Sequence, residues 1–211
     1  MTSSCKCTRA LRLVTIVLNL TRMHLVTSSI FLSSLTAHLP PLAAAFLLRT
    51  YFLTTLTLYI ARGRPALPIV GFYDAVTDIP LPPGPHPTPS NKIFGPEQYY
   101  TNPFEAKKGW EEFGGPQELT PNSWLALIQS TLVHPDEHLC KAQRSLLHYA
   151  AILGDTAPGT FAHLGKELDG AEILDGTIFV RVAGLTANRL GWIREGEPEK
   201  GWDNGGFFDR E

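Results

Sequence analysis

The stretch HPDEHLCKAQRSLLHYA, residues 134–150, has the periodicity of an amphipathic helix. At about 100° per residue its apolar side chains fall on one side of the helix, and the same side continues beyond the stretch. Pro135 suits a first helical turn, with His134 as the expected cap residue, and Asp136 and Glu137 lie where the helix dipole favours negative charge. We therefore expect a helix with one face in a core, formed by Leu139, Ala142, Leu146, Tyr149, Ala150 and Leu153.

Polar residues of this stretch gather beside the apolar face. His134, His138 and Lys141 fall on one arc of the expected helix, about 60° wide. Histidines spaced in this way are neighbours on a helix, and such pairs often give two ligands to one metal ion. A lysine joins such a site only when it is neutral or modified, because an ammonium repels a cation. The alternative is a capping histidine and a lysine whose stem covers apolar surface.

Composition narrows the classes of function. A chain of 211 residues can form one domain with a sizeable core, and its 18% of charged residues is a low share for a soluble protein. The net charge of −2 gives no electrostatic case for binding nucleic acid. The three cysteines do not make a disulfide framework, so we expect reduced thiols and a cytoplasmic location.

Two apolar helices are predicted near the N-terminus, over residues 24–39 and 41–61, joined at two prolines. The second has the length of a membrane span, but Arg49 lies near its middle. A central arginine costs roughly 2.5–3.5 kcal/mol on membrane-insertion scales. We therefore expect a buried core helix and not a membrane span, and a membrane-associated role for residues 11–61 is the alternative.

A long loop or insertion rich in proline and glycine is expected over residues 80–120. Six of the ten residues 80–89 are proline, which fixes φ and removes hydrogen-bond donors. Farther on, apolar residues at helical spacing run from Leu174 to Leu185, although the β-branched TIFV (177–180) leaves a short strand open. The predicted fold class is therefore mainly α, a buried bundle-like helical domain with one long loop.

Four stretches together resemble one protein family. They are RMHLVTSSIFL (22–32), LLRTYFLTTLTLYIARGRPALP (47–68), HPDEHLCKAQRSLLHYA and LDGTIFVRVAGLTANRLGWIREGE (174–197). In this order they resemble the questin oxidase-like family of fungal oxidoreductases, which includes enzymes of aflatoxin- and anthraquinone-type polyketide pathways. On this resemblance residues 21–211 are the C-terminal part of such a domain, and residues 1–20 are an unmatched extension.

The resemblance implies ring opening of a polycyclic aromatic polyketide such as an anthraquinone, by a Baeyer–Villiger-like (monooxygenase) or dioxygenase reaction. It also implies a non-haem iron held by histidines and a carboxylated lysine, and the use of NADPH. His138 and Lys141 match the histidine and lysine of the family's helix motif, and His24, in MHLVTSS, matches a further ligand. His134 matches a recurrent position without an assigned role and is kept among the candidate metal ligands.

Members of this family are longer, and their N-terminal half carries a His-rich motif that supplies the remaining ligands. The resemblance therefore leads us to expect a truncated enzyme, an incomplete portion of a larger all-α fold with an incomplete iron site. The expected partner is an aromatic polyketide substrate. The alternative is a non-catalytic helical scaffold that binds a partner or an aromatic ligand.

Overall fold

The computed structural model describes residues 20–64, 66–84 and 122–202. Within these ranges the regular structure is helical, so the predicted mainly-α fold class is confirmed. No strand forms in the described ranges, because residues 178–180 of TIFV belong to the first turn of a helix. Most of the predicted loop over 80–120 lies outside the described residues, as does nearly all of the predicted extension over 1–20.

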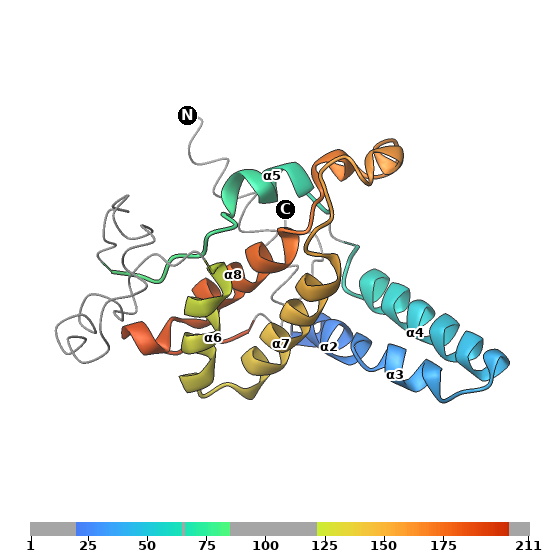
Figure 1. The fold of residues 1–211 in the computed structure, drawn as a ribbon, viewed down its shortest axis with the longest axis horizontal. Coiled ribbons are helices and arrows are strands. Elements are labelled where there is room, and N and C mark those ends of the chain that lie inside the picture. Colours follow the sequence, from blue (N-terminus) through green and yellow to red (C-terminus); the bar gives the residue numbers. More distant parts are fainter. Residues whose placement is uncertain (1–19, 65, 85–121, 203–211) are drawn as a thin grey trace, which may run out of the picture.

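The α-helices form a compact body with one projecting arm. In Figure 1, α6, α7 and α8 make up the body, α5 lies across one end of it, and α3 and α4 form the arm. The short 3-10 helices η2 and η3 lie between α7 and α8, and η4 follows α8. The α-helices are α2 (Leu20–Ser29), α3 (Leu32–Ala37), α4 (Pro41–Ala61), α5 (Ile69–Ala75), α6 (Ser123–Val133), α7 (Glu137–Leu153) and α8 (Ile178–Leu190), and the 3-10 helices are η2 (Ala162–Leu164), η3 (Ala171–Ile173) and η4 (Ile193–Glu195).

The core lies where α6, α7 and α8 meet. Gly191 ends α8 with a φ of +102°, a value that favours glycine, and a Cβ there would lie 2.3 Å from the carbonyl oxygen of Pro198. This turn directs the next side chain, Trp192, into the core, where it is 1% exposed. The buried members of the cluster are Leu127, Leu146, Val180, Ala183, Ala187 and Trp192.

The apolar face predicted for α7 is confirmed over its first turns. Its first members, up to Leu146, are buried, whereas Leu153 is 46% exposed at the point where the helix ends. Two polar residues are buried beside them. Gln143 Nε2 donates to the carbonyl oxygen of Ala183 at 2.9 Å, and Ser145 Oγ donates to the carbonyl oxygen of Lys141 at 2.9 Å. Because these donors are hydrogen-bonded, Gln143 and Ser145 can lie in the core, although the apolar pattern of the sequence did not predict their burial.

The start of α7 differs from the prediction. Asp136 is its N-cap, and its carboxylate accepts the backbone amide of His138 at 2.7 Å. His134 is instead the C-cap residue of α6. The prediction of His134 as the cap of this helix is wrong, because an aspartate carboxylate is among the best acceptors for the free amides of a first turn. His134 therefore does not share a helical arc with His138 and Lys141.

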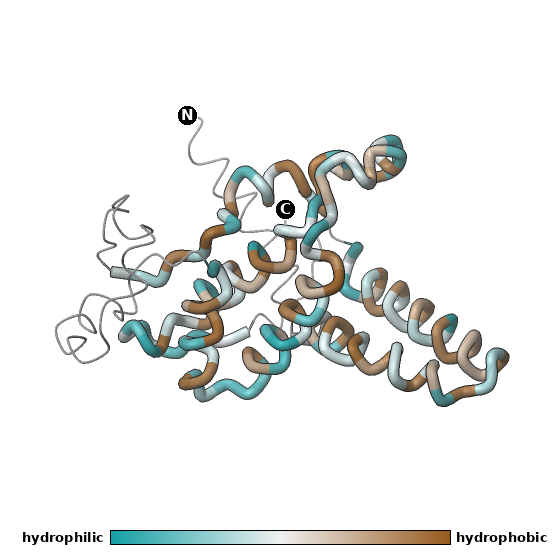
Figure 2. The backbone as a smooth tube through the Cα atoms, in the orientation of Figure 1, coloured by the Kyte–Doolittle hydropathy of each residue, from teal (hydrophilic) through white to brown (hydrophobic). Residues whose placement is uncertain are grey.

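The helix α4 is the largest departure from expectation. We predicted a core helix, but none of its residues is buried in the described structure. By length and composition it could cross a membrane. Figure 2 shows apolar residues along the whole arm, and the most exposed large ones on α4 are Leu42, Phe46, Phe52, Leu53 and Ile60. The prediction of burial was wrong because an apolar sequence indicates that a helix needs cover without identifying the segment that provides it.

A polar network holds α5 against the start of α8. The Arg181 guanidinium carbon lies 4.7 Å from the centre of the Tyr73 ring, and Arg181 Nε donates to Thr177 Oγ1 at 2.9 Å. The Tyr73 hydroxyl donates to Asp175 Oδ1 at 3.1 Å. Burial raises the pKa of Tyr73, so the phenol stays protonated and remains a donor. These contacts are structural and fix the end of the body that lies away from the candidate site.

Candidate functional site

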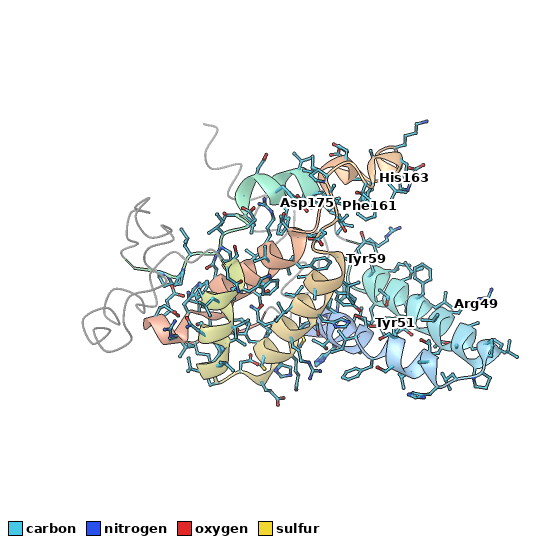
Figure 3. The ribbon with its side chains drawn as sticks, in the orientation of Figure 1. Arg49, Tyr51, Tyr59, Phe161, His163 and Asp175 are labelled. Atoms are coloured by element: carbon cyan, nitrogen blue, oxygen red, sulfur yellow. The ribbon has the colours of Figure 1, made fainter. Side chains whose placement is uncertain are left out.

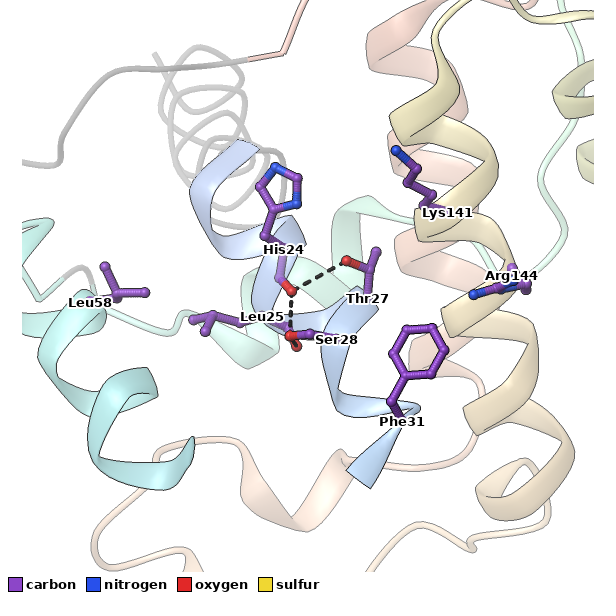
Figure 4. Close-up of a pocket in the computed structure, with 8 residues that line it drawn as sticks. All are labelled: His24, Leu25, Thr27, Ser28, Phe31, Leu58, Lys141 and Arg144. Atoms are coloured by element: carbon purple, nitrogen blue, oxygen red, sulfur yellow. Dashed lines mark hydrogen bonds between the residues drawn. The ribbon is translucent and has the colours of Figure 1, made fainter. Parts of the chain in front are cut away.

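An open cavity of about 620 Å³ lies between α2 and α7, with the C-terminal half of α4 at its edge (Figure 4). This volume falls in the range of about 300–1,000 Å³ that is typical of small-molecule sites. The α2 wall is mostly polar, the contact from α4 is apolar, and cationic side chains line the α7 wall. The lining residues are His24, Leu25, Thr27, Ser28, Phe31, Leu58, Lys141 and Arg144.

Two of the four candidate residues, His24 and Lys141, line this cavity, and a third, His138, contacts the ring of His24 beside it. The rings of His24 on α2 and His138 on α7 lie edge to face, with their centres 5.5 Å apart and their planes at 80°. Lys141 follows one turn after His138 and lines the cavity together with His24. Helical spacing alone placed His138 beside Lys141. The resemblance to the family was needed to add His24, because no local pattern connects residues so far apart in the sequence.

His134 lies elsewhere, at the junction of α6 and α7. Its Nε2 is 3.3 Å from the carbonyl oxygen of Leu190, and its Nδ1 accepts the backbone amide of Asp136 at 3.1 Å. Both ring nitrogens therefore hold the chain around the N-cap of α7, and the ring does not line the cavity. The ligand role of His134 stays a prediction, and the observed contacts are those of a structural residue.

Asp136 belongs to the candidate site, although the sequence indicated only a charge in a first turn. Its Oδ1 lies 2.9 Å from Nδ1 of His138, and its Oδ2 accepts the indole N–H of Trp202 at 2.7 Å. The carboxylate favours the tautomer of His138 that carries its proton on Nδ1. Nε2 of His138 then carries a lone pair that can accept a proton or bind a metal ion, and Glu137 Oε1 lies 3.9 Å from it. The signal that could have revealed this pair is the spacing Asp-x-His at a helix N-cap.

The environment of Asp136 also controls its ionisation. Burial raises the pKa of its carboxyl group, but hydrogen bonds from the amide and ring of His138 and from the indole of Trp202 outweigh burial. The net result is that the pKa of Asp136 is lowered from its ordinary value. The carboxylate of Asp136 is therefore ionised at neutral pH and accepts the hydrogen bond from Nδ1 of His138.

Replacing Asp136 by asparagine should remove a pH-dependent part of the stability. A carboxyl group whose pKa is lower in the folded chain stabilises the fold above its unfolded pKa of about 3.9, and that contribution is lost as the pH falls through the folded pKa. At pH 7 we expect Asp136→Asn to lower the free energy of unfolding by about 1–2 kcal/mol. Urea unfolding at several pH values measures the difference.

The difference between wild type and Asp136→Asn should shrink as the pH falls below about 4. Asp169→Asn is the matched control, because Asp169 is an exposed aspartate outside the candidate site. A stability difference for Asp136→Asn that stays constant from neutral to acidic pH would contradict the assignment.

Hydrogen bonds hold α2 in place between its neighbours. The Tyr51 hydroxyl of α4 donates to the carbonyl oxygen of Leu25, and in Figure 3 this side chain lies between α4 and α2 while Arg49 projects from the arm. On the other side, the hydroxyls of Ser29 and Tyr149 are 2.6 Å apart and join α2 to α7. The wall that carries His24 is therefore tied to both flanking helices.

The described residues do not complete a site for iron on their own. His24 and His138 offer two imidazoles, while Lys141 Nζ lies 3.1 Å from Glu137 Oε1 and forms an ion pair as an ammonium. No group of three His, Cys, Asp or Glu side chains converges within the described ranges. A non-haem iron centre of the common kind needs two histidines and a carboxylate on one face of the metal. Proton transfer at this site is therefore assigned to the side chains of the chain itself.

Of the comparisons with known proteins, the one with protein families found a match. A family model described as Questin oxidase-like matches residues 15–146. The matched range contains His24, His138 and Lys141, and it ends before the stretch 174–197. Searches of curated proteins and of solved structures found no match.

Proposed function

The chain belongs to the questin oxidase-like family, since the family model matches more than half of it, and on this basis we propose that it oxidises a polycyclic aromatic polyketide in the cavity between α2 and α7. The observation that carries the proposal is the pair His24 and His138 beside a cavity of about 620 Å³, large enough for three fused rings. Leu25, Phe31 and Leu58 supply apolar contacts to such rings.

His138 is the proposed proton acceptor. With Nδ1 held by Asp136, its Nε2 takes a proton from a phenol or enol of the substrate, and the resulting imidazolium is stabilised by the same carboxylate. His24 lies close enough to contact the same substrate group. Removing this proton raises the electron density of the ring that reacts with oxygen.

The proposed reaction opens a ring of the substrate with molecular oxygen. In the Baeyer–Villiger form one oxygen atom enters between a carbonyl carbon and its ring neighbour, so that a C–C bond breaks and two C–O bonds form a ring-expanded lactone. The second atom leaves as water, with a hydride from NADPH and a proton from solvent. Water then hydrolyses the lactone to a carboxylate and a hydroxyl group, and this second step opens the ring. In the dioxygenase form both atoms enter the product and no reductant is consumed.

The cofactors and location belong to the same proposal. NADPH is the proposed reductant of the Baeyer–Villiger form. Iron would require ligands in addition to His24 and His138, as the described residues do not hold it alone. Cys140 is a free, exposed thiol, which suits a reducing compartment, and we propose a cytoplasmic location.

The experiment uses the full chain, a hydroxyanthraquinone and ¹⁸O₂, with and without NADPH and ferrous iron. Mass spectrometry of the product should show one ¹⁸O atom per turnover with matching loss of NADPH for the Baeyer–Villiger form, and two without it for the dioxygenase form. His163→Gln, an exposed change on η2 far from the cavity, should leave the rate unchanged. No oxygen-dependent loss of the hydroxyanthraquinone under any of these conditions would contradict the proposal.

A second candidate is a non-catalytic scaffold that binds an aromatic ligand without converting it. The observation that favours it is that, in the described part of the chain, no group of three His, Cys, Asp or Glu side chains is arranged to hold a metal ion. Tight binding of the hydroxyanthraquinone with no incorporation of ¹⁸O would support the scaffold and exclude the enzyme.

A further inference from the structure

The charge on the walls of the cavity is one-sided. Lys141 and Arg144 are one turn apart on α7 and both face α2 across the cavity (Figure 4). None of the described residues that line the cavity is acidic. Lys141 is already paired, because its Nζ lies 3.1 Å from Glu137 Oε1 at the rim. Arg144 has no ion pair within the described ranges, so its charge is the one left for a ligand.

The hydroxyl groups of the cavity have little capacity to donate hydrogen bonds to a ligand. Ser28 Oγ donates to the carbonyl oxygen of His24 at 2.6 Å, and Thr27 Oγ1 donates to the same oxygen at 3.3 Å (Figure 4). Each hydroxyl has a single proton, so these two groups face a ligand mainly with lone pairs. The cationic donors in the cavity are on α7, so a ligand group placed beside that wall must be an acceptor.

Arg144 also lies beside an aromatic side chain. Its guanidinium carbon is 5.8 Å from the centre of the Phe31 ring, which projects from the segment between α2 and α3. A guanidinium binds a carboxylate or phenolate in its plane while its face contacts a ring. An aromatic ring of a ligand that lies against Phe31 would thus bring a substituent on its edge to Arg144.

We propose that the cavity selects aromatic ligands that carry an acidic oxygen, bound as the carboxylate or phenolate by Arg144. The ligand ring lies against Phe31 and Leu25, and its charged edge points to α7. This inference rests on the proposed function and adds the chemical class of the substrate to it. Arg144 is a specificity-determining residue in this scheme, and His138 accepts the proton of a different phenol or enol group of the substrate.

The test compares matched ligands on the full chain. Fluorescence titrations give the affinity for anthraquinone-2-carboxylate and for its neutral carboxamide, and a second pair compares 2-hydroxyanthraquinone, above the pKa of its phenol, with its methyl ether. We expect wild type to prefer each anion over its neutral partner about tenfold, less at high salt. The larger of the two preferences identifies whether the carboxylate or the phenolate is the better substrate group.

Arg144→Gln should bring the affinity for each anion down to that of its neutral partner, and Arg144→Lys should keep part of the preference. Arg189→Gln, an exposed change on α8 outside the cavity, is the control and should match wild type. The neutral ligands report whether each variant is folded. Equal affinity of wild type for both members of each pair would overturn this inference and leave the proposed function intact.

Two other results of these titrations would also overturn the inference. A preference for anions that persists in Arg144→Gln would show that another residue recognises the charge and would overturn the assignment. Failure of all four ligands to bind wild type would overturn both this inference and the proposed function.

Discussion

Trp192→Ala is expected to lower the free energy of unfolding by about 3–5 kcal/mol. Trp192 is 1% exposed within the cluster formed by α6, α7 and α8, and its indole N–H donates to Asn188 Oδ1 at 2.6 Å. The substitution removes the largest side chain of the core and leaves a cavity that its neighbours cannot fill. Urea unfolding followed by circular dichroism measures the loss.

Phe52→Ala is the matched control for this prediction. Phe52 lies on α4 and is 62% exposed, so truncating its ring should change the stability by about 0.5 kcal/mol or less. The contrast tests the division of the chain into a packed body and an exposed arm. Equal losses for the two variants would show that α4 is packed as tightly as α8, and the description of the arm would be wrong.

His138→Gln is expected to lower the turnover of a hydroxyanthraquinone by about 10²–10⁴-fold. Glutamine retains a polar side chain of similar reach but cannot accept the proton that the reaction releases. Binding of the substrate should change far less, because the apolar contacts come from α2 and α4. Initial rates over a range of substrate concentrations separate the loss in kcat from any change in KM.

His148→Gln is the control for this second prediction. His148 is an exposed histidine on the same helix, does not line the cavity, and contacts Tyr149 instead. Its variant should retain the wild-type kcat. If His138→Gln also kept the wild-type kcat, the proton-acceptor role of His138 would be excluded, whichever product the reaction forms.

The helical fold and the core face of α7 could be predicted from the sequence because they depend on local periodicity. Leu139 and Leu146 recur at the spacing of one helix face, and both are buried. The exposure of α4 could not be predicted in this way. Its apolar residues give no preferred face, and whether such a helix is covered depends on segments far from it in the chain.

The candidate site was predicted in part for similar reasons. The spacing of His138 and Lys141 is a property of one helix, so the sequence placed them together. His134 was misplaced because the helix begins at Glu137, after the Asp136 cap. The contact between His138 and Asp136 was missed because it depends on the rotamer of a cap residue, and Trp202 reaches that carboxylate from a distant segment.

The central claim is that an aromatic ligand binds between α2 and α7. Hydrogen–deuterium exchange of the full chain, with and without a saturating hydroxyanthraquinone, tests it most directly. We predict slower exchange in peptides that cover residues 24–31 and 138–144, with the body around Trp192 unchanged. Bound ligand without any slowing in these two segments, or with slowing confined to α4, would contradict the account.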